Sequence, residues 1–139
     1  MEYIDENIPV FWAGNAGPVF LMVHGAGHCA LTFAALARIV KTKYQVVSFD
    51  FRGHGLNKLR GEEEYNFTPE NLCNEVKQVL AYIKSKVEDP VLLCGHSMGG
   101  AIACRVGAEM ESELAGMIII DVVEGTAIEA LPFMDNILL

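Results

Sequence analysis

Residues 95–100 read Gly-His-Ser-Met-Gly-Gly and match the pattern G-x-S-x-G. The apolar run Val91 to Cys94 precedes them, and a helical pattern over Met98 to Glu109 follows. This order of strand, turn and helix is the context in which the pattern forms a nucleophile elbow. The stretch therefore predicts an α/β protein with Ser97 exposed at the carboxyl end of a buried strand.

The glycines around Ser97 support this interpretation. A serine at so sharp a turn has a strained backbone, so the residues two before and two after it have room for almost no side chain. Gly95 and Gly99 occupy those two positions. The turn also directs the N-terminus of the following helix, with the Met98 N–H, toward developing negative charge. The alternative is a glycine-rich turn in which the serine is incidental.

Outside this stretch, apolar runs alternate with helical patterns through the whole chain. We expect buried strands at Val10 to Ala13, Val19 to Val23, Tyr44 to Phe49, Val91 to Cys94 and Met117 to Ile120. Helices are expected over Leu31 to Val40 with apolar positions Leu36, Ile39 and Val40, from the Thr68 N-cap and Pro69 to just before Pro90, and over Met98 to Glu109. The order predicts one mostly parallel sheet with helices on both faces.

A second glycine-rich segment, Gly25-Ala26-Gly27, follows the Val19 to Val23 run and has two interpretations. With Ala30 it fits G-x-G-x-x-A, and Asp50 ends the next strand, which is typical of a dinucleotide-binding site. In a serine hydrolase the same loop lies beside the nucleophile and supplies one backbone N–H to the oxyanion hole.

The hydrolase interpretation explains more of the sequence. It pairs the Ala26 N–H with the Met98 N–H around the oxyanion of a tetrahedral intermediate. The nucleotide interpretation leaves Ser97 without a role. We therefore favour the hydrolase.

The candidate triad acid is Asp121, which directly follows the apolar run Ile118-Ile119-Ile120. Its place at the carboxyl end of a strand suits the acid of a Ser, acid, His triad. Asp50 also ends a strand, but hydrolases with this chain order place the acid after the serine. The alternative for Asp121 is an ordinary polar residue at a strand end.

All histidines of the chain precede Ser97, and they are His24, His28, His54 and His96. The order Ser, acid, His requires a histidine after Asp121, so we expect the general base to lie outside this chain. We expect His24 to hold the oxyanion loop through a backbone hydrogen bond and His54 to shape its own loop. His96 is expected to point away from the turn, and His28 is the candidate for a substrate contact.

Composition excludes several classes of function. The 139 residues are 52% hydrophobic and 20% charged, which is typical of a chain that folds around a core. A net charge of −8 leaves no positive excess for nucleic acid or an anionic membrane. The apolar runs are far shorter than the roughly 20 residues of a membrane-spanning helix, and the acidic N-terminus does not read as a secretory signal. We expect no nucleic-acid or membrane partner and no export.

The cysteines predict a reducing compartment. They are Cys29, Cys73, Cys94 and Cys104, and they show no C-x-x-C spacing. Cys94 and Cys104 lie in apolar sequence surroundings, as reduced buried thiols do. We expect a cytoplasmic or also nuclear location, no metal site and no cofactor.

Several stretches together resemble the α/β-hydrolase fold: His24-Gly25, Asp50 to Gly55 (DFRGHG) and Gly95 to Gly100 (GHSMGG). More narrowly, Gly95 to Ala103 (GHSMGGAIA) and Ile120 to Ala127 (IDVVEGTA) resemble the protein phosphatase methylesterase family. The second string discriminates, because general esterases and epoxide hydrolases share the elbow. The likeness runs from about Pro18 to the C-terminus.

The resemblance implies a serine carboxylesterase with Ser97 as nucleophile and Asp121 as triad acid. It implies that the substrate and partner is the catalytic subunit of protein phosphatase 2A, methylated on its C-terminal leucine. The family's catalytic histidine, later strands and lid are missing, so residues 1–139 are expected to be a partial α/β-hydrolase domain, truncated after the strand that carries the acid and inactive alone. The alternative is a non-catalytic binding or vestigial chain.

Overall fold

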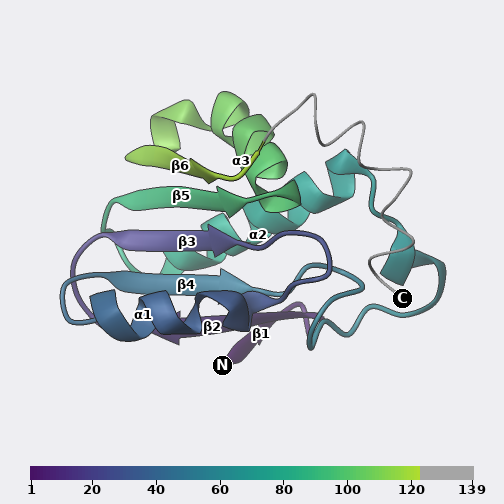
Figure 1. Ribbon diagram of the computed structural model, residues 1–139, viewed down its shortest axis with the longest axis horizontal. Coiled ribbons are helices and arrows are strands. Elements are labelled where there is room, and N and C mark those ends of the chain that lie inside the picture. Colours follow the sequence, from purple (N-terminus) through teal and green to yellow (C-terminus); the bar gives the residue numbers. More distant parts are fainter. Residues whose placement is uncertain (123–139) are drawn as a thin grey trace.

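A six-stranded sheet forms the centre of the computed structural model, which describes residues 1–122. The strands are β1 (Glu2–Ile4), β2 (Ile8–Ala13), β3 (Val19–Val23), β4 (Gln45–Phe49), β5 (Val91–His96) and β6 (Gly116–Ile120). They lie in the order β1-β2-β4-β3-β5-β6 (Figure 1). β4, β3, β5 and β6 are parallel, whereas β1 and β2 join antiparallel. The predicted mostly parallel sheet is confirmed.

Helices cover both faces of this sheet (Figure 1). α1 (Ala34–Val40) lies on one face, and α2 (Pro69–Lys86) and α3 (Met98–Glu109) lie on the other. Alternate residues of β5 serve the two layers, since Leu93 packs into the cluster under α2 and α3 while Cys94 packs into the cluster under α1. Burial on both faces explains why the central strands are apolar at nearly every position.

The α2 helix begins and packs as its sequence predicts. The Thr68 side chain accepts a hydrogen bond from the Asn71 N–H, and Pro69 is the first helical residue. The buried stripe consists of Leu72, Cys73, Glu75, Val76, Val79, Leu80 and Ile83. Spacing of three and four residues places this stripe on one face, against the sheet.

The expected helix over Leu31 to Val40 differs from the structure. Its first part is a 3-10 turn (Ala30–Phe33), and the α-helix begins only at Ala34. Leu36 and Ile39 are 42% and 76% exposed, while Ala37 and Val40 pack on the sheet. A 3-10 turn has about three residues per turn, which rotates the inward face of the helix that follows.

Two further expectations need correction. The Val10 to Ala13 strand begins at Ile8, and the sequence analysis missed its antiparallel partner β1, which is too short to show a pattern. Cys104 is exposed, and Cys94 and Cys73 are the buried thiols. Cys104 lies on α3 beside Ala103, but the core face of that helix is carried by Ile102, Ala103 and Val106.

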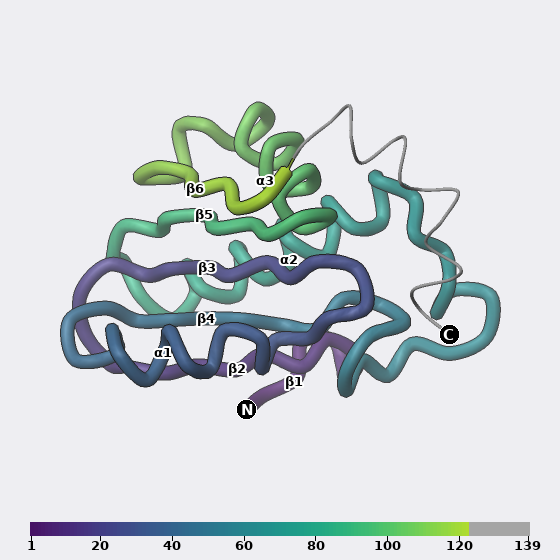
Figure 2. Tube along the Cα trace, in the orientation of Figure 1, coloured from purple at the N-terminus to yellow at the C-terminus, as the bar shows by residue number. Residues whose placement is uncertain are grey.

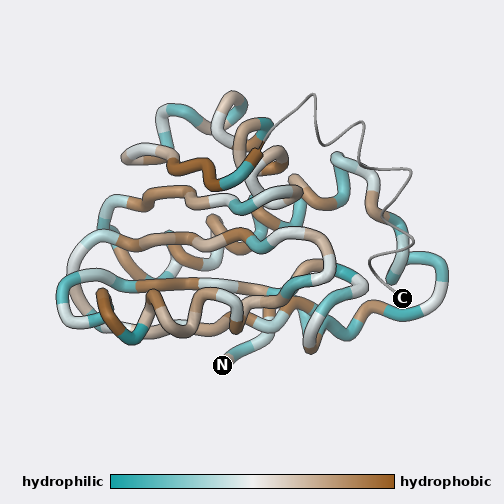
Figure 3. Tube along the Cα trace, viewed as in Figure 1, coloured by the Kyte–Doolittle hydropathy of each residue, from teal (hydrophilic) through white to brown (hydrophobic). Residues whose placement is uncertain are grey.

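The edge of the sheet beyond β5 is apolar and open. β6 pairs with β5 on one side, and among residues 1–122 no strand pairs with its outer side. Met117, Ile118, Ile119 and Ile120 are all 37% or more exposed. Figure 3 shows this strand as one of the most hydrophobic segments of the chain.

Candidate active site

Ser97 lies at the turn between β5 and α3 and has the strained backbone expected of an elbow. Its φ of 53° and ψ of −123° lie outside the regions that L-residues normally occupy. The residue is exposed. Its carbonyl oxygen accepts hydrogen bonds from the Gly100 and Ala101 N–H groups at 2.8 and 3.1 Å, which ties the turn to the first turn of α3. The hydroxyl is thus carried at the carboxyl edge of the sheet.

Close backbone packing explains the two flanking glycines. A Cβ atom on Gly95 would lie 2.4 Å from the Gly99 carbonyl oxygen. A Cβ atom on Gly99 would lie 2.4 Å from the carbonyl oxygens of both Val23 and His24. These contacts leave no room for a side chain, and the second one brings the N-terminus of α3 against the end of β3.

The loop after β3 therefore reaches Ser97. A Cβ atom on Gly25 would lie 3.0 Å from the Ser97 Cβ atom. Two amides of this loop are already used, because the Gly27 N–H donates to His54 Nε2 at 3.1 Å and the His28 N–H donates to the Gly25 carbonyl at 3.2 Å. Within residues 1–122, no acceptor pairs with the Ala26 N–H.

His24 holds this loop from inside the protein, as the sequence analysis predicts. Its Nδ1–H donates to the Gly25 carbonyl at 2.8 Å, and its Nε2 accepts from the Phe51 N–H at 3.1 Å. The side chain is fully buried, and burial lowers its pKa to about 4. The imidazole is therefore neutral at pH 7, and its role is to hold the loop in place.

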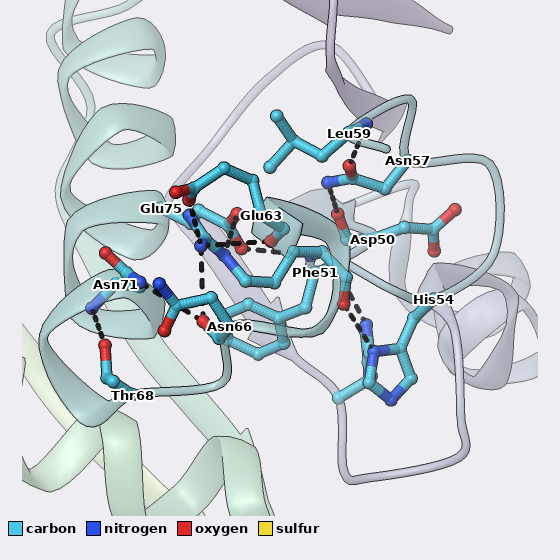
Figure 4. Close-up of polar contacts among 12 residues, drawn as sticks. Asp50, Phe51, His54, Asn57, Leu59, Glu63, Asn66, Thr68, Asn71 and Glu75 are labelled. Atoms are coloured by element: carbon cyan, nitrogen blue, oxygen red, sulfur yellow. Dashed lines mark hydrogen bonds and ion pairs between the residues drawn. The ribbon is translucent and has the colours of Figure 1, made fainter. Parts of the chain in front are cut away.

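Both carboxylate oxygens of Asp50 accept hydrogen bonds from within the protein. Its Oδ1 accepts from the Ala30 N–H at 2.6 Å, its Oδ2 accepts from the Leu56 N–H at 2.8 Å, and its carbonyl accepts from the Asn57 side chain at 3.0 Å. Figure 4 shows the Asp50 and Asn57 contact. The Asp50 side chain is buried, and each of its carboxylate oxygens already accepts a backbone N–H, so it is not presented to a ribose hydroxyl. The geometry therefore argues against the dinucleotide interpretation.

Asp121 lies at the same edge of the sheet as Ser97. It directly follows β6, whose Ile120 is the register partner of His96 on β5. Asp121 is exposed and has a φ of 53°, so the chain turns sharply at this residue. The string Val123 to Ala127, which the family resemblance also uses, lies outside the described residues.

The remaining histidines do not complete a triad within the described chain. The His28 and His96 rings lie side by side, with centroids 5.3 Å apart and planes inclined by 31°. The Nδ1 atom of His96 is buried and has no partner among residues 1–122. No imidazole in this part of the chain hydrogen-bonds the Ser97 hydroxyl.

The sequence analysis missed a buried ion pair that anchors the loop after β4. Arg52 donates from its backbone N–H and from Nε to the Glu75 carboxylate of α2, at 3.1 and 2.9 Å. Its Nη1 also reaches Glu63 Oε2 at 3.4 Å and the Asn66 carbonyl at 3.2 Å. Burial raises the pKa of Glu75, and the bonds to Arg52 oppose that rise. The signal was present, since an acid in an otherwise apolar stripe requires a partner.

Neither a metal site nor a membrane helix is found in the part of the chain that the structure describes. No three His, Cys, Asp or Glu side chains of residues 1–122 converge on a point where a metal ion could bind. No helix among them is long and apolar enough to cross a membrane.

A serine on a strained turn between a parallel strand and a helix, beside a loop from the neighbouring strand, defines the α/β-hydrolases. The family model described as Hydrolase_4, serine aminopeptidase S33, matches residues 14–123, and the chain belongs to this family. The solved structure of E-2-(acetamidomethylene)succinate hydrolase has the same fold, with a TM-score of 0.77 and 22% identity over 93% of this chain and 47% of that chain.

The resemblance to the protein phosphatase methylesterases is also confirmed. Protein phosphatase methylesterase 1 of Mus musculus is 40% identical over 136 residues, which are 96% of this chain and 35% of the relative. The probable protein phosphatase methylesterase 1 of Caenorhabditis elegans is 39% identical over 93% of this chain and 36% of its own length. The chain thus spans about a third of the length of these relatives.

Proposed function

We propose that this chain is the nucleophile-bearing part of a serine carboxylesterase that removes the methyl ester from the C-terminal leucine of the protein phosphatase 2A catalytic subunit. The observation that carries the proposal is the meeting of Ser97, the Gly25 to Gly27 loop and the end of β6 at one edge of the sheet. The identity with methylesterase relatives, which are named for action on a protein phosphatase, supports the substrate.

In this reaction Ser97 Oγ attacks the ester carbonyl carbon while a histidine takes its proton. The N–H groups of Ala26 and Met98 donate to the oxyanion of the tetrahedral intermediate. Met98 is the first residue of α3, so its N–H has no partner within the helix. Collapse of the intermediate transfers the proton to the leaving oxygen and releases methanol, and water then hydrolyses the acyl-enzyme.

Asp121 has the role of orienting the histidine and stabilising its charged form. We place that histidine outside the described residues, because His24 and His54 are engaged by backbone groups and neither His28 nor His96 hydrogen-bonds the Ser97 hydroxyl among residues 1–122. The chain on its own is therefore proposed to be inactive.

A chimera tests this function directly. Residues 1–122 replace the matching part of the mouse methylesterase, and the product is assayed with a peptide that ends in leucine methyl ester. We expect hydrolysis, a loss of about 10⁴-fold or more in Ser97→Ala and Asp121→Asn, and no change in Ser112→Ala, an exposed serine outside the site. A folded chimera without turnover would instead support a non-catalytic binding role.

A further inference from the structure

His54 makes two hydrogen bonds that link two loops of the site. Its Nδ1 lies 2.8 Å from the Arg52 carbonyl oxygen, and its Nε2 lies 3.1 Å from the Gly27 nitrogen. The first bond is within its own loop. The second crosses to the loop that carries the Ala26 N–H.

These partners determine the tautomer of the ring. A carbonyl oxygen only accepts, so His54 Nδ1 carries the hydrogen. A backbone N–H only donates, so His54 Nε2 is unprotonated. The imidazole must therefore be neutral for both bonds to exist, and protonation of Nε2 removes the acceptor from the Gly27 N–H.

The backbone around His54 is folded tightly enough to present the ring in one direction. Gly53 and Gly55 have φ angles of +65° and +52°, and a Cβ atom on Gly55 would lie 2.2 Å from Asp50 Oδ2. The ring packs between those of His24 and Phe67, with centroid distances of 5.0 and 5.7 Å. This loop is also anchored to α2 by the ion pair between Arg52 and Glu75.

The two loops hold each other reciprocally. The loop after β4 donates the Phe51 N–H to His24, while the loop after β3 donates the Gly27 and Ala30 N–H groups to His54 and Asp50. The loops leave the same end of the sheet (Figure 2). The Gly27 bond is the one nearest to the Ala26 N–H.

We propose that His54 is a positioning residue for the oxyanion hole, which holds the Gly27 N–H and thereby fixes the direction of the Ala26 N–H. This inference rests on the proposed function. The titratable and charged groups around the ring are His24 at the end of β3, Asp50 and Arg52 in its own loop, and Glu75 on α2. Among these four groups, His24 is the one that also has an imidazole ring accepting a backbone N–H, that of Phe51.

Two substitutions separate the bonds of His54. An asparagine places an N–H near the position of Nδ1 and keeps the bond to the Arg52 carbonyl, but it cannot reach Gly27. A glutamine places its oxygen near the position of Nε2 and can accept from the Gly27 N–H. His54→Asn and His54→Gln are therefore a matched pair that differ in the proposed contact.

Nuclear magnetic resonance of the ¹⁵N-labelled chain tests the contact without any catalysis. We expect the Gly27 amide resonance to shift in His54→Asn and to return toward its wild-type position in His54→Gln, whereas the Phe51 amide, which donates to His24, stays in place in both variants. Hydrogen exchange at Gly27 should accelerate about tenfold in His54→Asn and return toward the wild-type rate in His54→Gln. A Gly27 amide that is unaffected by His54→Asn, or that changes equally in both variants, overturns the proposal.

The chimera then tests the consequence for catalysis. We expect His54→Asn to lower kcat about tenfold with KM within about twofold, and His54→Gln to retain most of the activity. Equal kcat in wild type and His54→Asn would show that the contact does not position the oxyanion hole. An inactive chimera in which the Gly27 amide responds to the two variants as expected would contradict the proposed esterase and leave the contact itself established.

Discussion

The backbone N–H of Ser97 donates to the carbonyl oxygen of Ile120 at 3.0 Å. This hydrogen bond joins the elbow to the last residue of β6, and Asp121 follows directly. The nucleophile and the proposed acid are thus carried by neighbouring parallel strands whose ends are tied together. Pairing of β6 with β5 is what brings Asp121 to the site, so the sheet register and the site depend on each other.

Gly99→Ala should strongly destabilise the chain. Its methyl group would meet two backbone carbonyl oxygens at 2.4 Å, and neither can move without shifting the end of β3. We expect a loss of about 2 to 4 kcal/mol in the free energy of unfolding, measured by urea titration. Gly116→Ala is the control, because its Cβ would meet only Leu92 at an ordinary 3.8 Å. Equal stability of the two variants would contradict the close packing.

Because of His24, the free energy of unfolding should decrease at acid pH. Its pKa of about 4 in the folded chain lies below the ordinary value of 6.5, so the folded state disfavours protonation. The contribution of His24 to the free energy of unfolding is fully present above pH 6.5. About 3 kcal/mol of it is lost as the pH falls toward 4.

The difference in unfolding free energy between wild type and His24→Asn, measured by urea titration across this pH range, isolates that contribution. The raised pKa of Glu75 acts with the opposite sign, since its contribution is lost as the pH rises. It is present in both proteins and cancels in the difference. A difference that does not vary between pH 4 and 6.5 would count against a buried neutral His24.

Arg52→Met should destabilise the chain by about 3 to 5 kcal/mol at pH 7, because it leaves the Glu75 carboxylate buried without a cation. The double variant Arg52→Met with Glu75→Leu should recover most of this loss. Arg60→Met is the control, since the Arg60 side chain is 67% exposed and its ion pair among residues 1–122 is with Glu64 at the surface. Urea unfolding measures all three, and similar effects at Arg52 and Arg60 would refute a special role for the buried pair.

The exposed edge at β6 should make the isolated chain prone to association. A long apolar edge strand with unpaired backbone groups is a template for another strand. Ile118→Lys places a charge on this edge and should lower light scattering at a given concentration. Ile39→Lys is the control, because Ile39 is 76% exposed on α1, away from the edge. Equal effects of the two lysines would indicate a general gain of solubility.

Residues 1–139 expressed alone should show little esterase activity. Without a base, the Ser97 hydroxyl stays neutral, and loss of a triad member lowers turnover about a million-fold in subtilisin. A p-nitrophenyl ester assay beside the full-length mouse methylesterase measures the difference. Turnover within about tenfold of that enzyme would reveal a base among His24, His28, His54 and His96.

Local structure could be predicted from the sequence wherever one short stretch contains all the information needed. The strain at Ser97 follows from the glycines on each side, and the start of α2 follows from Thr68 and Pro69. The two-sided burial of β3, β4 and β5 follows from their continuous apolar runs. The helix before β4 was placed only in part, because the 3-10 turn over Ala30–Phe33 changes which side chains face inward.

The sequence by itself determined the order of the helices and of all strands except β1, the elbow and the candidate nucleophile. Only the tertiary structure decided that Asp50 clamps two loops, that Arg52 pairs with Glu75, and that His54 accepts from Gly27. These three contacts join residues 20 to 27 positions apart in the chain, and no local pattern assigns one partner to the other. They form because parallel strands end at one edge of the sheet, where loops with unpaired N–H groups must find acceptors in one another.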